Sequence, residues 1–315
     1  MPLPTQVDYF DTPVQGVKVP EAQEAGVVLL IKREDLNHPY VSGNKWWKLK
    51  YNLQEAVDQG HHTLLTFGGA YSNHLYATAA AARELGLNAI GIIRGEEVLP
   101  LNPTLAFAHA NGMKLHFISR GRYRDNAEDE FIQELHDLFG DFYRMPEGGT
   151  NALAIKGVRE WAHQIKNEVE FDYLCLPVGT GGTLAGLIAG LDGAGEVVGY
   201  SVLKNGGFLR ATVQEMLNEV PQPFRNWRIE TSYDHGGYAK TTPALHTFIR
   251  RMKDEFALPL DAVYTGKMMF GILDMLKAGK FKAGSTVLAL HTGGLQGNYP
   301  NKSSNTSFSF PNPFT

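Results

Sequence analysis

The segment Pro177-Val-Gly-Thr-Gly-Gly-Thr183 separates an apolar run from a helix-forming run. The residues before it, 173–177 (YLCLP), are typical of a buried strand, and residues 183–191 are typical of a helix. Glycines in such a turn let backbone N–H groups approach an anion, and the positive end of the helix dipole attracts it. The segment therefore predicts a strand, a phosphate-binding turn and a helix, with a plain tight turn as the alternative. A nicotinamide site is disfavoured, because no acidic residue follows about 20 residues later.

The same order of strand, turn and helix recurs along the chain. Runs typical of strands cover residues 27–31, 63–67, 89–93, 114–118, 142–145, 173–177, 197–203 and 286–291. Runs typical of helices cover residues 46–58, 73–85, 104–111, 126–139, 151–166, 183–191, 208–220 and 243–255. This alternation predicts an α/β fold with mostly parallel sheets covered by helices. Ligands then bind beyond the carboxyl ends of strands, where the glycine-rich turns lie.

The composition limits the classes of protein to which the chain can belong. Its 315 residues suggest about two domains, and its 43% hydrophobic content is typical of a globular protein. A net charge of −4 gives no support for nucleic-acid binding, and no apolar run approaches the ~18 residues of a membrane crossing. The single cysteine, Cys175, lies in an apolar run and we predict that it is buried. The start of the chain does not resemble a signal peptide, so we expect a cytoplasmic protein.

No metal site is predicted. His61, His62 and His235 lack the spacing that metal ligands show, so we interpret them as surface or loop residues.

Two further segments combine glycine with reactive or polar side chains. In Ser42-Gly-Asn-Lys45 a lysine opens a predicted helix, where an electropositive environment can keep its amine nucleophilic. A solvated helix lysine is the alternative. In Gly68-Gly-Ala-Tyr-Ser-Asn-His74 a strand again leads to a helix start. Ser72 or Asn73 is either an N-cap or part of a carboxylate-binding helix N-terminus.

Taken together, eight motifs occur in one order. They are Lys32-Arg-Glu-Asp35, Ser42-Gly-Asn-Lys45, Lys48-Leu49, Gly68-Gly-Ala-Tyr-Ser-Asn73, Gly148-Gly-Thr-Asn151, Gly179-Thr-Gly-Gly-Thr183, Val263-Tyr-Thr-Gly-Lys267 and His291-Thr-Gly-Gly294. With these motifs the chain resembles the 1-aminocyclopropane-1-carboxylate (ACC) deaminase / D-cysteine desulfhydrase family over nearly its whole length. The members of this family are pyridoxal-phosphate (PLP) enzymes of the tryptophan-synthase-β type, or fold type II.

The resemblance implies an architecture. We expect two open, twisted, mostly parallel sheets with flanking helices, and the cofactor between two domains. The larger, PLP-binding domain is expected at residues 1–54 and 151–315, and the smaller α/β domain at residues 55–150. The resemblance also implies a homodimer that acts on a small amino acid.

The resemblance also assigns cofactor-binding residues. Lys45 matches the lysine that holds PLP as a Schiff base, and Lys48 is expected to help hold the phosphate. The phosphate loop matches Gly179, Thr180, Gly181, Gly182 and Thr183.

Further residues are expected around the substrate. Ser72 matches a serine implicated in carboxylate binding or proton handling, and Asn73 matches the residue beside the cofactor's ring oxygen. Their neighbour His74 is either a substrate contact or a packing residue at the helix start. Tyr264 matches an active-site tyrosine, and Tyr238 matches a second tyrosine near the substrate.

Two threonines bear on the reaction. ACC deaminases have Tyr-Glu-Gly-Lys and His-Leu-Gly-Gly where this chain has Thr265 and Thr292, as desulfhydrase-like members do. A hydroxyl group beside the pyridine nitrogen favours its cation less than a carboxylate would. We therefore predict β-elimination, converting D-cysteine to pyruvate, ammonia and sulfide. ACC deamination is the alternative, and a PLP-binding protein with little catalysis is a second alternative.

A tryptophan pair departs from the family pattern. Trp47 stands where an arginine is usual, and Trp46 precedes it. The two rings either pack in the core or shape a wall of the substrate site.

Overall fold

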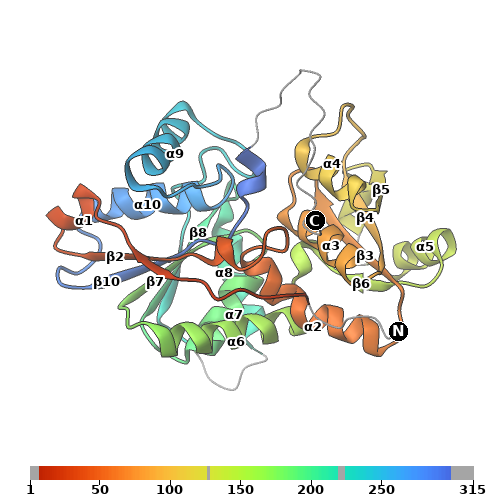
Figure 1. Cartoon of the computed structure of the whole chain (residues 1–315), viewed down its shortest axis with the longest axis horizontal. Helices are drawn as coiled ribbons and strands as arrows, with labels where there is room; N and C mark the ends of the chain where they lie inside the picture. Colours follow the sequence, from red (N-terminus) through yellow and green to blue (C-terminus); the bar gives the residue numbers. More distant parts are fainter. Residues whose placement is uncertain (1–6, 126–127, 219–223, 299–315) are drawn as a thin grey trace.

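The structure, a computed structural model, describes residues 7–125, 128–218 and 224–298. Within these residues the chain forms two sheets, which lie side by side along the long axis of the molecule (Figure 1). The predicted α/β fold with two mostly parallel sheets is confirmed.

The smaller sheet is parallel and has the order β5-β4-β3-β6 in the described part of the chain. Its strands are β3 (Thr63–Gly69), β4 (Asn88–Arg94), β5 (Met113–Ile118) and β6 (Tyr143–Met145). The flanking helices are α3 (Asn73–Glu84), α4 (Pro103–Ala110) and α5 (Asp129–Phe139). Neighbouring residues of β3 point to opposite faces, so Leu64 packs in one hydrophobic cluster with α3 and Leu65 in another with α5.

The larger sheet has the order β1-β2-β10-β7-β8-β9. Its strands are β1 (Val14–Gly16), β2 (Val28–Lys32), β7 (Tyr173–Val178), β8 (Glu196–Ser201), β9 (Trp227–Glu230) and β10 (Thr286–Leu290). The edge strand β1 is antiparallel to β2, and the other described pairs are parallel.

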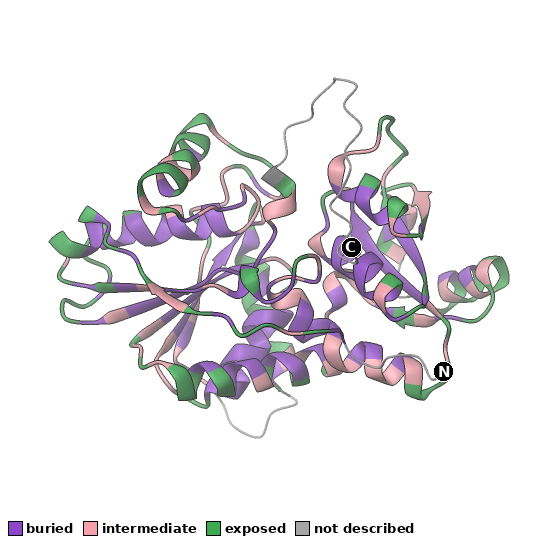
Figure 2. Ribbon diagram, in the orientation of Figure 1, coloured by how far each residue is buried: buried purple, intermediate pink, exposed green. Residues whose placement is uncertain are grey.

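Helices cover both faces of the larger sheet (Figure 1). One layer contains α2 (Asn44–Asp58), α6 (Ala152–Glu168), α7 (Gly182–Leu191) and α8 (Leu209–Leu217), and the other contains α1 (Pro20–Glu24), α9 (Pro243–Phe256) and α10 (Thr265–Lys277). In β10, Leu288 joins the hydrophobic cluster of α6 and α7, whereas Val287 and Ala289 join that of α10. The central strands β7, β8 and β10 are therefore almost entirely buried, and Figure 2 shows exposed residues on the outer faces of the helices and in loops. Cys175 is buried in β7, as predicted.

Every predicted strand and helix corresponds to an observed one, with ends shifted by a few residues. Residues 126–127 and 219–220 of two predicted helices lie outside the described residues. The sequence analysis did not predict β1, α1, β9 or α10. The first three are short, and α10 opens with Thr265-Gly266, which are poor helix formers.

The strands of the smaller sheet lie within the segment 55–150, and those of the larger sheet lie outside it. The expected boundary at residues 54/55 falls inside α2, a continuous helix that packs on α6 and also contacts α3. The domain division stays a prediction.

The contact between α2 and α6 brings two backbones close together. A Cβ atom built on Gly157 of α6 would lie 2.0 Å from the carbonyl oxygen of Trp47. The Trp47 ring stacks on Trp161, with centroids 6.1 Å apart. Trp46 and Trp47 are 4% and 1% exposed and neither lines the cavity described below, so the pair packs in the core.

We predict that Gly157→Ala lowers the free energy of unfolding by about 1–3 kcal/mol, because the clash outweighs the gain in helix propensity. Gly207→Ala is the control, since a Cβ there meets nothing within 4 Å. Urea unfolding followed by circular dichroism measures both. Equal stability of the Gly157 variant and the wild type would contradict the close contact.

Candidate active site

A cavity lies where the carboxyl ends of strands from both sheets meet. Its walls come from the start of α2, the turn between β3 and α3, the turn between β7 and α7, and the loops before α10 and after β10. The lining residues are Asn44, Lys45, Lys48, Ser72, Asn73, His74, Gly148, Pro177, Val178, Gly179, Thr180, Gly181, Thr183, Leu184, Tyr264 and Thr292. The predicted sites thus come together from segments that are far apart in the sequence.

Gly43 fixes the start of α2 against the loop after β10. Its φ of +68° is left-handed, and a Cβ built on it would lie 2.0 Å from the carbonyl oxygen of Thr292. The Asn37 side chain binds both polar groups of Gly43: its Nδ2 donates to the carbonyl at 3.1 Å, and its Oδ1 accepts from N–H at 2.8 Å. Only glycine fits this position, which places Lys45 two residues later at the cavity.

Burial and the charge of Asp261 determine the pKa of the Lys45 amine. Desolvation lowers the pKa of Lys45 to about 8, and the charge of Asp261 partly opposes this shift. Its Nζ donates to Oδ1 of Asn44 at 3.1 Å. An appreciable fraction of this amine is therefore neutral, and nucleophilic, near neutral pH.

Lys48 lies one helical turn further along α2 and is almost completely buried. Its Nζ donates to the carbonyl of Gly148 at 2.5 Å and to Oγ1 of Thr150 at 2.8 Å. The Thr150 hydroxyl also lies 2.7 Å from that of Thr180. Desolvation and the neighbouring Lys45 lower the pKa of Lys48. Lys48 therefore links the start of α2 directly to Gly148 and Thr150 and, through the Thr150 hydroxyl, to Thr180.

The N-terminus of α7 has backbone N–H groups that an anion can bind. Its N-cap residue, Gly181, has a φ of +89° and offers no side-chain cap. The first backbone hydrogen bond runs from Ala185 N–H to the Gly181 carbonyl, so the preceding N–H groups are available to a ligand. The hydroxyl of Thr183 accepts from Nδ2 of Asn44 at 2.8 Å. This geometry favours the phosphate-binding interpretation of residues 177–183 over a plain tight turn.

The N-terminus of α3 faces the cavity from the smaller sheet. Ser72 is the N-cap and accepts from Leu75 N–H at 3.3 Å. Asn73 accepts through Oδ1 from Gln296 at 2.8 Å. Ser72 therefore has the capping role that was one of its two predicted alternatives, and its helix still presents first-turn N–H groups to an anion.

His74 is buried and has a defined tautomer. The Thr66 hydroxyl donates to the Met145 carbonyl at 3.0 Å, so the 2.8 Å contact with His74 requires Nε2 to donate. Desolvation and the charges of two lysines lower the pKa of His74. Its Nδ1 is a buried acceptor without a partner among the described residues. A cavity residue thus keeps one unused polar atom.

Tyr264 and Tyr238 differ in their access to the cavity. Tyr264 lines it beside Gly179, whereas Tyr238 packs behind, with ring centroids 6.2 Å apart. Desolvation raises the pKa of Tyr238 to about 12 and raises that of Tyr264 well above its ordinary value. Both phenols therefore retain their protons at neutral pH and can act as proton donors.

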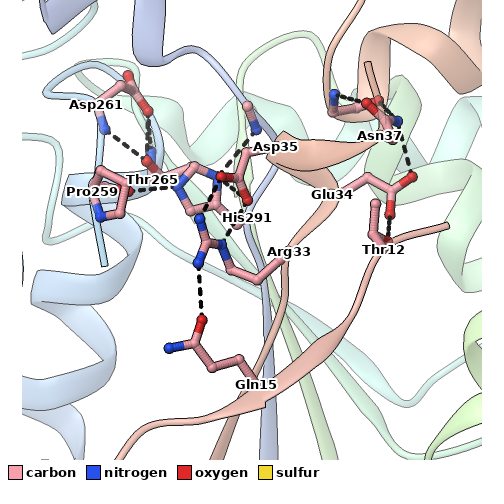
Figure 3. A network of polar contacts seen from close by, with 12 residues as sticks. Thr12, Gln15, Arg33, Glu34, Asp35, Asn37, Pro259, Asp261, Thr265 and His291 are labelled. Carbon is pink, nitrogen blue, oxygen red and sulfur yellow. Dashed lines mark hydrogen bonds and ion pairs between the residues drawn. The ribbon is translucent and has the colours of Figure 1, made fainter. Parts of the chain in front are cut away.

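Asp261 organises the start of α10 (Figure 3). Its carboxylate accepts from the N–H groups of Val263, Tyr264 and Thr265, each at 2.8 Å. The Thr265 hydroxyl donates to the same carboxylate at 2.7 Å and accepts from Asp261 N–H at 3.0 Å. Thr265 does not line the cavity, and its hydroxyl group bonds to Asp261 within this turn. The predicted cofactor contact of Thr265 thus falls outside the cavity wall, while Thr292 lies in it.

A second network joins β2 to the loops that hold Asp261 and Thr292 (Figure 3). Arg33 donates to both oxygens of Asp35, at 2.9 and 2.8 Å. Nδ1 of His291 lies 3.4 Å from Asp35, and its Nε2 donates to the Pro259 carbonyl at 2.7 Å. Arg33 and Asp35 of the motif at residues 32–35 do not line the cavity. They help to fix the loops before α10 and after β10, which form part of its wall.

The sequence analysis missed Asn44, Thr150 and Asp261. Asn44 and Thr150 were inside recognised motifs, but their partners lie on other segments. Asp261 was not found, because it stands four residues before α10 begins, outside the N-cap position, and α10 itself was not predicted. Gly182, although in the predicted phosphate loop, packs against Thr150 rather than lining the cavity.

His61 and His235, interpreted from the sequence as surface or loop residues, have local partners. His61 binds Asp141 at 2.7 Å and His235 contacts Thr242 at 2.9 Å. Among the described residues no group of three or more His, Cys, Asp or Glu side chains could hold a metal ion. In the same residues no helix has both the length and the apolar character that a membrane crossing requires.

Comparison with known families identifies the chemistry. The family model described as "Pyridoxal-phosphate dependent enzyme" matches residues 6–293. The chain belongs to this family. It is 31% identical over 303 residues to a putative 1-aminocyclopropane-1-carboxylate deaminase of Pyrococcus horikoshii, covering 92% of this chain and 91% of the relative. It is also 31% identical to a bifunctional D-cysteine desulfhydrase/1-aminocyclopropane-1-carboxylate deaminase of Arabidopsis thaliana, covering 95% and 80%.

Solved structures agree with the family assignment. An ACC deaminase homologue superimposes with a TM-score of 0.82 at 29% identity, covering 94% of this chain and 93% of the other. A threonine deaminase of Solanum lycopersicum, 15% identical, gives a TM-score of 0.65, with coverage of 91% and 80%, and shows the shared fold alone. The resemblance drawn from the eight motifs is confirmed, and the chain is a PLP-dependent lyase of fold type II.

The cavity fits PLP. The uncapped α7 N-terminus, the hydroxyls of Thr180 and Thr183 and the nearby Lys48 suit its phosphate. The Lys45 amine suits its aldehyde, and His74 Nδ1 is an unused acceptor. These residues would hold the cofactor of the family.

We predict that reductive methylation of Lys45 in cofactor-free protein rises through a midpoint near pH 8, where the ammonium loses its proton. Ordinary lysines titrate near 10.4. Peptide mass spectrometry measures the rate, with exposed Lys253 as internal reference. Asp261→Asn should move the midpoint lower, because the charge that favours the ammonium is removed. A midpoint near 10 would show that the amine is not desolvated.

Proposed function

We propose that the protein is a β-elimination lyase acting on a small amino acid, with D-cysteine converted to pyruvate, ammonia and sulfide. Relatives whose names include D-cysteine desulfhydrase support this proposal, among them one from Yersinia pestis that is 29% identical over 289 residues. The observation that carries the choice of reaction is chemical. No Asp or Glu stands among the described residues that line the cavity, and the group offered from the loop after β10 is the hydroxyl of Thr292.

This lining favours elimination over ring opening. PLP, when bound, accepts electron density from the substrate's Cα, and a carboxylate beside its ring nitrogen strengthens that effect. Opening a cyclopropane carbon–carbon bond needs more assistance than expelling a thiol from Cβ. Thr265 stands where ACC deaminases have the glutamate of Tyr-Glu-Gly-Lys, and a hydroxyl in place of that carboxylate suits the easier reaction.

The chain's own residues supply the proton transfers and the binding contacts. The Lys45 amine, partly neutral near pH 7, can remove the Cα proton, and a group near Ser72 is the alternative base. The substrate carboxylate is expected at the N-terminus of α3, beside Ser72. Tyr264 lines the same cavity and keeps its phenolic proton, so it can donate to the departing sulfur.

ACC deamination is the second candidate function. Names of relatives favour it, since the Pyrococcus and Arabidopsis proteins both carry it. A PLP-binding protein with little catalysis is the third candidate, and its cavity would be the same. We further propose a cytoplasmic homodimer, with a small amino acid as substrate and neither nucleic acid nor membrane as partner.

The first test concerns the cofactor. Wild-type protein supplemented with PLP should show a visible absorbance band that disappears on borohydride reduction. Lys45→Ala should lack it, because Nζ of Lys48, the other lysine in the described cavity wall, is held by Gly148 and Thr150. Absence of the band in the wild type would contradict the role of Lys45.

The second test concerns the substrate. The holoprotein is incubated with D-cysteine, L-cysteine, D-serine, β-chloro-D-alanine and ACC, and sulfide, pyruvate and 2-oxobutanoate are measured. We expect pyruvate and sulfide from D-cysteine, because Cβ carries a good leaving group. Release of 2-oxobutanoate from ACC alone would overturn this choice, and no turnover of any compound would favour the third candidate.

A further inference from the structure

Arg94 and Glu147 carry opposite charges at the carboxyl edge of the smaller sheet. Arg94 is the last residue of β4, and Glu147 is the first residue of the 3-10 turn η3 (Glu147–Gly149), just after β6. Since β3 lies between β4 and β6, the two side chains flank the end of β3. That end leads directly into the turn that carries Ser72.

This ion pair is unusually open. Nη1 of Arg94 lies 4.0 Å from Oε1 of Glu147, whereas Arg33 and Asp35 approach to 2.8 Å and Arg251 and Glu21 to 2.7 Å. Burial and the charge of the neighbouring Glu147 raise the pKa of the Tyr123 phenol, so the Glu147 carboxylate faces this phenol as well as Arg94. The two side chains are 41% and 38% exposed, so solvent and solutes reach both. The pair contributes little by itself, and a ligand can separate it easily.

The open pair adjoins the candidate active site. A Cβ built on Gly69 would lie 3.4 Å from Nη2 of Arg94 and 3.8 Å from Cε1 of Tyr238, whose ring packs on Tyr264 in the cavity wall. Glu147 precedes Gly148, which lines the cavity. Arg94 also lies 5.6 Å from the centre of the Tyr123 ring. The two charges therefore lie just outside the part of the cavity wall that Gly148 and Tyr264 form.

We propose that Arg94 and Glu147 form a second subsite that binds a zwitterionic group at the far end of the substrate's Cβ substituent. The inference deepens the proposed function and rests on it, because the bond that breaks is the Cβ–S bond. The substrate class is a thioether in which sulfur joins the reacting amino acid to a second α-amino acid.

The opposite charges of Arg94 and Glu147 are the reason for proposing a zwitterionic ligand. The guanidinium can bind a carboxylate through two parallel hydrogen bonds, and the Glu147 carboxylate can accept from an ammonium group. A zwitterion can bind both residues at once, so that two short contacts to the ligand replace the single 4.0 Å contact between Arg94 and Glu147. A substituent with a single charge would satisfy one residue and leave its opposite without a close partner.

The reaction balances with water as the second reactant. The substrate R–S–CH2–CH(NH3+)–COO− and one water give R–SH, pyruvate and ammonium. The Cα–H and Cβ–S bonds break, and the sulfur receives a proton. Here R carries the second amino-acid group, which leaves with the thiol.

The experiment compares four thioethers of D-cysteine that share a three-carbon chain. The substituents are 3-amino-3-carboxypropyl (zwitterionic), 3-carboxypropyl (anionic), 3-aminopropyl (cationic) and propyl (neutral). Pyruvate release by the holoenzyme gives kcat/KM for each compound and for D-cysteine. The variants are Arg94→Met and Glu147→Gln, with Arg83→Met on the exposed face of α3 as the matched control.

With the zwitterionic compound we expect kcat/KM to fall about 10- to 100-fold in Arg94→Met and in Glu147→Gln. The anionic compound should respond only to loss of Arg94 and the cationic one only to loss of Glu147. D-cysteine and the propyl compound should change less than about twofold in both variants, and Arg83→Met should change nothing. Equal losses on all compounds, or no loss with the zwitterion, would overturn the subsite.

A failure of the proposed function is recognised separately. If the wild type releases no sulfide from D-cysteine, the elimination reaction is wrong, whatever the variants do. Calorimetric titration of the holoprotein with the zwitterionic thioether then decides on the subsite. Binding about tenfold weaker in both variants supports it, and equal binding overturns it.

Discussion

The backbone contact between Gly43 and Thr292 is the constraint on which the site depends. No side chain fits at Gly43, because a Cβ there would lie 2.0 Å from the Thr292 carbonyl oxygen. The contact joins the start of α2 to the loop after β10, so Lys45 and the Thr292 hydroxyl face one cavity. Two hydrogen bonds with the Asn37 side chain fix Gly43. The contacts among Arg33, Asp35 and His291 fix the loop after β10.

Electrostatics in this cavity follow from burial more than from close ion pairs. Two lysines, Lys45 and Lys48, share one turn of α2, and desolvation lowers the pKa of both. Asp261 acts on Lys45 as a charge while its oxygens remain occupied by the start of α10. The cavity thus combines a partly neutral amine with an anion-binding helix N-terminus, the arrangement that a PLP enzyme requires.

Much of the fold could be predicted because its signals are local. Strand runs, helix runs and glycine turns recur with short spacing, and the observed strands and helices follow them closely. Lys45 and the turn at residues 177–183 each left an alternative open, and the order of the eight motifs along the chain decided their assignment. The prediction was incomplete at α10, where the signal is Asp261, several residues before the helix begins. Missing that helix also hid the two hydrogen bonds between the Thr265 hydroxyl and Asp261.

The sequence by itself determined the α/β class, through the alternation of strand and helix runs along the chain, and it located the glycine turn at residues 177–183 and Lys45 through short motifs. The tertiary structure alone decided which polar groups are used up and which are free. Thr265 is bound to Asp261, Trp47 packs on Trp161 in the core, and Arg94 and Glu147 stand apart across β3. These outcomes depend on distances between segments remote in the chain. The spacing of residues along the sequence does not encode such distances.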